Sequence, residues 1–178
     1  MLVDLSHVIN EEHPIFPDNP SNKIVAINTI SRGDTSNTSQ VTLFSHNGTH
    51  MDAPYHFNSK GLPIDELPPS YFFYKNPFLL NIRKKAHEYI LKEDLSKDKK
   101  LLEKADILLV NTGFSRHRKA NPNRYLTNPP ALSLEAAKFI IEKLTSIRAV
   151  GIDTVSIESI DQGKKEEFPV QDSLSFFT

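Results

Sequence analysis

The chain has 178 residues, of which 38% are hydrophobic, and a formal net charge of −1. This length is sufficient for one domain with an apolar core, and the absence of cysteine excludes disulfides and thiolate metal sites. The small net charge gives no reason to expect nucleic acid or an anionic membrane as a partner, and no apolar run approaches membrane length. We therefore expect a soluble cytoplasmic protein.

Short apolar segments separated by loops predict a series of strands. Their apolar and β-branched residues alternate with polar ones or form short continuous runs. The predicted strands span residues 2–5, 23–30, 40–45, 78–82, 107–111 and 149–152. No internal repeat or low-complexity linker divides the chain, so we expect a single domain over residues 1–178.

One clear helix is predicted after Ser133, which is a suitable N-cap, and Glu135 would lie near the positive end of that helix. Apolar residues recur after the cap at helical spacing: Leu134, Ala137, Ile141 and Leu144. Residues 83–104 contain eight basic and five acidic residues, which indicates a solvated helical region covering one side of the sheet. We assign residues 121–130 to a loop. Together, these elements predict the α/β class.

Three of the seven histidines fall within residues 46–56, together with an aspartate, a glycine and a proline. Imidazole and carboxylate are the groups that bind divalent ions when no thiolate is present, and three protein ligands leave a position open for water. His46, His50 and Asp52 would form such a set. His56 would then be a proton carrier, because the ordinary pKa of imidazole lies near neutrality.

The backbone of this window has two possible forms. The spacing of His46 and His50 would suit one face of a helix, but Gly48 and Pro54 disfavour a continuous helix. A strand that runs into a tight loop fits better. The window could also be a polar surface loop rich in histidine, or hold buried histidines that satisfy one another's hydrogen bonds. We favour a metal site because the ligand types, their spacing and the loop-forming residues agree.

Residues 45–57 closely resemble the His-x-Gly-Thr-His-x-Asp-x-Pro-x-His motif of the cyclase family of metal-dependent hydrolases, which includes bacterial kynurenine formamidases. The resemblance extends over nearly the whole chain. Residues 4–7 and 16–18 are similar to the family's opening, residues 108–113 to its central strand, and residues 132–156 to its helix–strand segment. The resemblance implies a swivelling β/β/α-type fold and assembly into a homodimer or homotetramer.

The resemblance also implies roles for particular residues. His46, His50 and Asp52 would bind a divalent metal, with zinc as the first expectation and manganese as the second, and Asp52 would bridge to a second ion where one is present. His56 would be the general acid/base, and Phe16, in the proline-rich segment 13–20, would lie against the substrate ring. The implied reaction is hydrolysis of an amide, a cyclic amide or a lactone, such as that of N-formylkynurenine to kynurenine and formate in tryptophan catabolism.

The carboxyl end differs from the family pattern. Family members usually place a histidine at the position of Gln171 and continue through a strand that carries a metal-binding glutamate. This chain ends at Thr178, so we expect a domain that lacks the family's C-terminal strand, with Asp172 as a partial substitute. Two alternatives to an active hydrolase are an impaired relative that folds and binds metal, and a non-enzymatic binding module around Phe16 and Tyr55.

Overall fold

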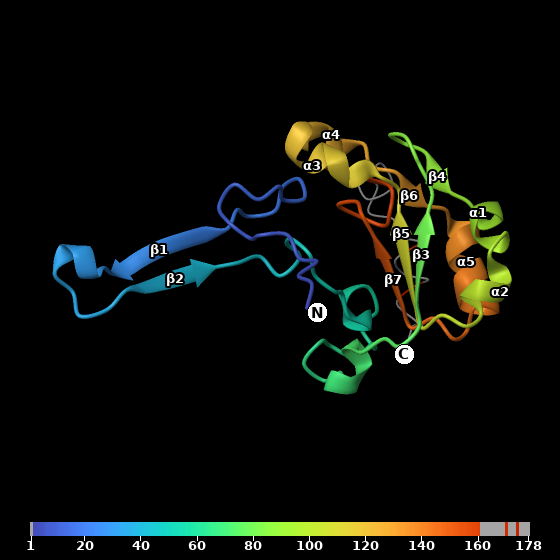
Figure 1. The fold of residues 1–178 in the computed structure, drawn as a ribbon, viewed down its shortest axis with the longest axis horizontal. Coiled ribbons are helices and arrows are strands. Elements are labelled where there is room, and N and C mark those ends of the chain that lie inside the picture. The colour runs from blue at the N-terminus through green and yellow to red at the C-terminus, as the bar shows by residue number, and fades with distance from the viewer. Residues whose placement is uncertain (1, 161–169, 171–173, 175–178) are drawn as a thin grey trace. The chain divides into compact units, whose positions relative to one another are not determined.

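The structure is a computed structural model that describes residues 2–160, 170 and 174 (Figure 1). The chain forms two compact units, Met1–Met51 and Asp52–Thr178. The prediction of one domain over residues 1–178 therefore stays a prediction. Within the described residues, no helix has both the length and the apolar character needed to cross a membrane.

The first unit consists of an antiparallel hairpin and long loops. Strands β1 (Lys23–Asn28) and β2 (Thr38–Thr42) pair with Ile24 opposite Val41, and all their residues are exposed. Their connection contains the short 3₁₀ helix η1 (Ile30–Arg32). The buried residues described in this unit are all polar: His13, Asn22 and Asn47. Its described part therefore has no apolar core.

The second unit contains a parallel sheet with the strand order β3-β5-β7. Strands β3 (Pro77–Asn81), β5 (Ile107–Asn111) and β7 (Ala149–Ile152) form it, and β4 (Tyr89–Ile90) pairs with β6 (Ala131–Leu132) in a separate parallel ladder. Parallel neighbours need crossover connections, which helices usually supply. The connections here contain α1 (Lys92–Ser96), α2 (Lys99–Leu102) and α5 (Leu134–Lys143).

The apolar core of the second unit lies between this sheet and the helices α1, α2 and α5, which lie along one side of it in Figure 1. Leu108 and Val110 of β5 alternate with less buried neighbours, and Ile140 of α5 is completely buried. The hydroxyl of Ser133 accepts a hydrogen bond from the backbone N–H of Ala136 at 3.2 Å, which confirms the predicted cap of α5. The mixed α/β class is confirmed.

Five predicted elements differ from the structure. The strand predicted at 23–30 is β1, which ends at Asn28. The strand at residues 2–5 is absent, and the Asp4 carboxylate instead accepts the backbone N–H of Ser6 in a local turn. The strand predicted at 40–45 is β2, which begins and ends earlier. The helical region 83–104 also contains β4. The loop predicted at 121–130 contains α4 (Pro122–Thr127), which Asn121 caps by accepting the backbone N–H of Arg124.

Candidate metal site

The loop after β2 carries the candidate ligands, and no α-helix forms in it. Gly48 has a φ of 67°, a left-handed conformation that turns the chain between His46 and His50. A Cβ added at Gly48 would lie 3.1 Å from Cγ1 of Ile9 and 3.3 Å from Cε1 of His13. The predicted tight loop is confirmed, and Gly48 supplies both its conformation and the space for its neighbours.

A buried asparagine link anchors this loop. The side-chain amide of Asn47 donates to Oδ1 of Asn22, and the amide of Asn22 donates to the backbone carbonyl of Asn10 at 2.8 Å. The Oδ1 atom of Asn47 is buried and has no hydrogen-bond partner in the described part of the chain. The sequence did not identify this link, because Asn47 stands in the motif but its partner is 25 positions away. We infer that the link positions the backbone between the two histidines.

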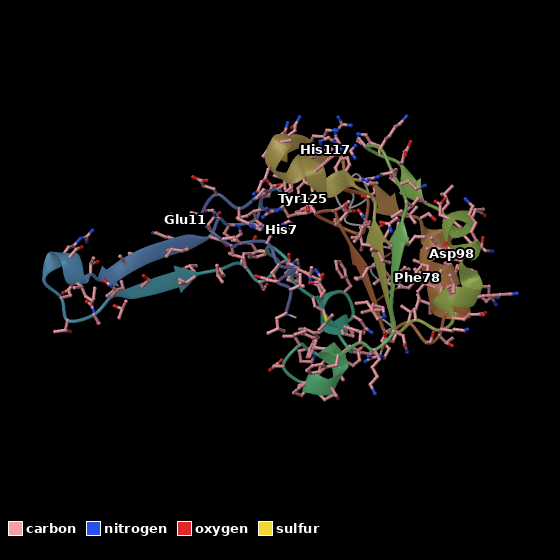
Figure 2. The ribbon with its side chains drawn as sticks, in the orientation of Figure 1. His7, Glu11, Phe78, Asp98, His117 and Tyr125 are labelled. Atoms are coloured by element: carbon pink, nitrogen blue, oxygen red, sulfur yellow. The ribbon has the colours of Figure 1, made fainter. Side chains whose placement is uncertain are left out.

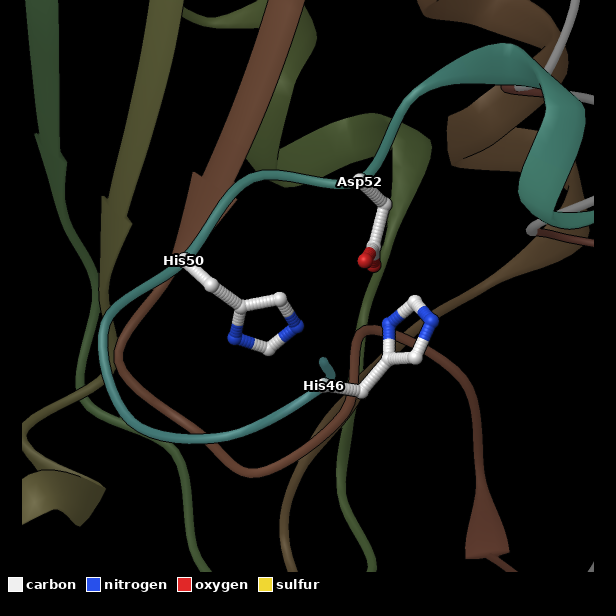
Figure 3. A group of neighbouring side chains, drawn as sticks. All are labelled: His46, His50 and Asp52. Carbon is white, nitrogen blue, oxygen red and sulfur yellow. The ribbon is translucent and has the colours of Figure 1, made fainter. Parts of the chain in front are cut away.

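The structure brings together the three predicted ligands, His46, His50 and Asp52. One candidate ligand atom from each lies within 4.8 Å of the other two, and Figure 3 shows the three side chains turned toward one another. The ring centroids of His46 and His50 are 5.5 Å apart, with 79° between the ring planes. His46 is half-buried, whereas His50 and Asp52 are exposed. The group is therefore accessible from water.

This donor set fits a divalent ion. Nδ1 of His50 lies 3.0 Å from the carbonyl oxygen of Gly48. Because a carbonyl only accepts, we assign the proton to Nδ1, which leaves the lone pair of Nε2 for a metal. Two imidazoles and one carboxylate suit zinc, manganese, iron or cobalt, and three ligands leave room for water or substrate.

The two remaining predicted site residues, His56 and Phe16, lie outside this group of three. His56 ends the short 3₁₀ helix η2 (Pro54–His56), is exposed, and has its ring centroid 4.2 Å from that of Phe57. Phe16 is half-buried, and its carbonyl accepts the backbone N–H of Asn19 at 3.1 Å. Their roles as general acid/base and as a substrate contact stay predictions. Gln171 and Asp172 lie outside the described residues.

Comparison with known proteins identifies the family. The Cyclase family model matches residues 3–159, which is most of the chain. The chain belongs to the cyclase family. The family predicted from the motif at residues 45–57 is thereby confirmed. Membership of this family supports the interpretation that the protein is an enzyme of the hydrolase class.

Several relatives of the cyclase-family chain cover most of its length. The kynurenine formamidase of Bacillus thuringiensis strain Al Hakam is 32% identical over 160 residues, 89% of this chain and 71% of the relative. That of Bacillus anthracis is 30% identical over 159 residues, with the same shares. An uncharacterized protein of Haemophilus influenzae is 38% identical over 108 residues, 61% of this chain and 76% of the relative.

A solved structure shares the fold. A crystal structure described as that of a novel cyclase matches with a TM-score of 0.65 and 15% sequence identity. The match covers 86% of this chain and 66% of the other, so this chain spans slightly less than two thirds of that structure. The cyclase-type α/β fold expected from the sequence is confirmed.

Proposed function

We propose that the chain is a metal-dependent hydrolase that cleaves a formamide, with N-formylkynurenine as the first substrate to test and kynurenine and formate as the products. The observation that carries this proposal is the convergence of His46, His50 and Asp52, with ligand atoms within 4.8 Å of one another. The kynurenine formamidases at 30–32% identity support the substrate class. The functional form we propose is a homodimer or homotetramer.

His46, His50 and Asp52 would hold the ion, zinc in the first instance and manganese in the second. A bound divalent ion supplies a nucleophilic hydroxide near neutral pH and stabilises the negative charge that develops on the carbonyl oxygen. The contact from Nδ1 of His50 to the Gly48 carbonyl fixes the orientation of that imidazole. The side chain of Asn47 holds the backbone between the two histidines through Asn22.

His56 would donate a proton to the leaving nitrogen. An amine departs readily from the reacting carbon only when its nitrogen is protonated, so a general acid is required. An imidazole suits this role because its ordinary pKa lies near neutrality. The exposed position of His56 allows proton exchange with water. Phe16 would contact the aromatic ring of the substrate.

The test combines metal analysis with turnover. Protein purified without added metal is expected to contain about one or more equivalents of divalent ion per chain, and to hydrolyse N-formylkynurenine. A chelator should abolish turnover, and added zinc or manganese should restore it.

The variant His50→Ala should lose both metal and activity. His87→Asn is the matched control, because His87 is an exposed histidine outside the loop. The φ of His87 is 61°, a left-handed conformation that asparagine tolerates. Turnover that is unaffected by the chelator would contradict the proposal. Metal binding without turnover of a formamide or lactone would instead indicate an impaired relative.

A further inference from the structure

The carboxyl ends of strands β3, β5 and β7 carry a polar cluster that the proposed hydrolysis does not use. The carboxylate of Asp153, directly after β7, accepts the backbone N–H and the hydroxyl of Thr112 at 2.8 and 2.5 Å. It also accepts the backbone N–H of Ser115 at 3.3 Å. These bonds fix the turn from β5 into the 3₁₀ helix η4 (Phe114–Arg116). Ligands of open parallel sheets bind at this carboxyl edge.

Two arginine side chains contact the glycine in this turn. Gly113 has a φ of 72°, and a Cβ added there would lie 1.7 Å from Nη1 and 2.8 Å from Cζ of Arg83. The guanidinium of Arg83 therefore lies directly over the glycine. Nη1 of Arg116 donates to the carbonyl oxygen of Gly113 at 2.8 Å. Both arginines are exposed residues, so their remaining donors are accessible to a ligand.

The positive charge of this pair is not balanced within the described chain. Neither Arg83 nor Arg116 forms an ion pair with a carboxylate among residues 2–160, 170 and 174. Both carboxylate oxygens of Asp153 already accept bonds from Thr112 and Ser115. Two guanidinium groups against one residue repel each other, and a bound anion would remove that repulsion.

The positive charge of Arg116 also affects the pKa of the next residue, His117. It begins α3 (His117–Ala120), which follows β5 and η4 along the chain. Its side chain is labelled in Figure 2. Its Nε2 atom is buried and accepts or donates no hydrogen bond in the described part of the protein. Burial lowers the pKa of the imidazole, and the nearby Arg124 and Arg116 lower that pKa further.

We propose that Arg83, Arg116 and the turn at Gly113 form a binding site for the oxyanion group of a small molecule, a carboxylate or a phosphate. The planar guanidinium group binds such oxygens through paired N–H donors, and two arginines on one glycine provide donors from two directions. Glycine is required at position 113 because a side chain there would displace Arg83. The anion site stands independently of the hydrolysis proposed above.

The first experiment measures anion binding to the full chain at pH 7 and low ionic strength by isothermal titration calorimetry. Inorganic phosphate and benzoate are titrated separately, so that a phosphate ligand is distinguished from a carboxylate ligand. We expect saturable binding of at least one of them. Arg83→Gln and Arg116→Gln should each weaken that binding by roughly tenfold, because each removes a charged donor.

The matched control is Arg32→Gln in η1, an exposed arginine of the other unit, which should leave the affinity unchanged. Equal affinity in all three variants would mean non-specific ion association and would overturn the proposal, as would the absence of saturable binding for both anions. Circular dichroism of Arg83→Gln and Arg116→Gln establishes that the fold is kept. His50→Ala should bind the anion normally, so failure of the hydrolase proposal is distinguishable from failure of the anion site.

A second readout follows His117 by nuclear magnetic resonance. A bound anion should raise the pKa of the His117 imidazole, because negative charge favours the protonated ring. The shift should disappear in Arg116→Gln and persist in Arg32→Gln. An unchanged His117 titration with saturating anion would place the ligand elsewhere and overturn the assignment to this turn.

Discussion

Different kinds of contact stabilise each of the two units internally. In the second unit, apolar side chains such as Leu102, Leu108 and Ile140 are completely buried between the sheet and its helices. In the first unit, both strands are exposed and the buried side chains described are polar. The loop with His46 and His50 therefore depends on particular hydrogen bonds and on Gly48. Substitutions in this loop should therefore mainly lower metal affinity, whereas substitutions in the core of the second unit should mainly lower the free energy of unfolding.

The largest expected effect is loss of metal from the variant His46→Ala. Removal of one of three ligands should reduce metal affinity on the order of 100-fold or more, since even groups that only orient a ligand contribute 10–100-fold. The free energy of unfolding of the metal-free protein should fall by only about 1 kcal/mol, because the half-buried imidazole also packs near Phe44. Metal titration and urea denaturation measure the two effects. Unchanged metal affinity would remove His46 from the proposed site.

A pair of core and hairpin substitutions tests the contrast directly. Ile140→Ala, in the buried face of α5, should lower the free energy of unfolding by about 2–5 kcal/mol, because it leaves a cavity. Val41→Ala, on β2 and 54% exposed, should lower it by about 0.5 kcal/mol or less. Urea denaturation of both variants gives the comparison. Similar losses would show that the hairpin is buried in the functional form of the protein.

The variant Asn47→Ala tests whether polar contacts position the candidate ligands. It removes the bond to Asn22 but none of the three ligand side chains. We expect roughly tenfold weaker metal binding, the size of effect typical of groups that orient ligands. Asn123→Ala, at an exposed asparagine of α4, is the control. Wild-type metal affinity in Asn47→Ala would limit this link to a structural role.

The smallest effect concerns acid stability in the second unit. Burial raises the pKa of Asp94, but the bonds from Lys84 and the backbone N–H of Leu91 outweigh it and bring the pKa below the ordinary 3.8. The carboxylate is therefore bound more strongly in the folded state. Its contribution to stability is fully present well above pH 3.8 and is lost as the pH falls through the lower folded pKa.

Asp94→Asn should accordingly lower the free energy of unfolding by about 1 kcal/mol at pH 7. The difference from the wild type should shrink as the pH falls from about 5 toward about 2. Denaturation at several pH values measures it, and Glu93→Gln in the same helix is the control. A difference that does not depend on pH would exclude the ion pair as the cause.

Two core strands and the N-cap of α5 in the second unit were predicted correctly, because these elements have the burial pattern or the capping residue that sequence rules detect. The strands at 107–111 and 149–152 and the cap at Ser133 agree with the structure. The three candidate ligands were also predictable, because they lie within seven consecutive residues. The contact between Arg83 and Gly113 could not be predicted, because it joins positions that are distant in the sequence.

The errors have local causes. Residues 121–130 were predicted to form a loop because the segment is rich in proline and polar residues. Proline at the first helical position together with a capping Asn121 instead begins helix α4 there. Residues 2–5 have the composition of a strand, but the structure gives them no strand partner. Composition alone therefore does not establish a strand.

Three glycines with positive φ form a graded set for separating backbone cost from steric cost. At Gly33 an added Cβ would have no heavy atom within 4 Å, at Gly48 the nearest atom would be 3.1 Å away, and at Gly113 it would be 1.7 Å away. L-alanine at Gly33 therefore measures the conformational cost alone, about 1–2 kcal/mol. The excess cost at the other two positions measures how tightly each turn is enclosed. D-alanine, introduced by chemical ligation, would relieve the first cost at all three positions.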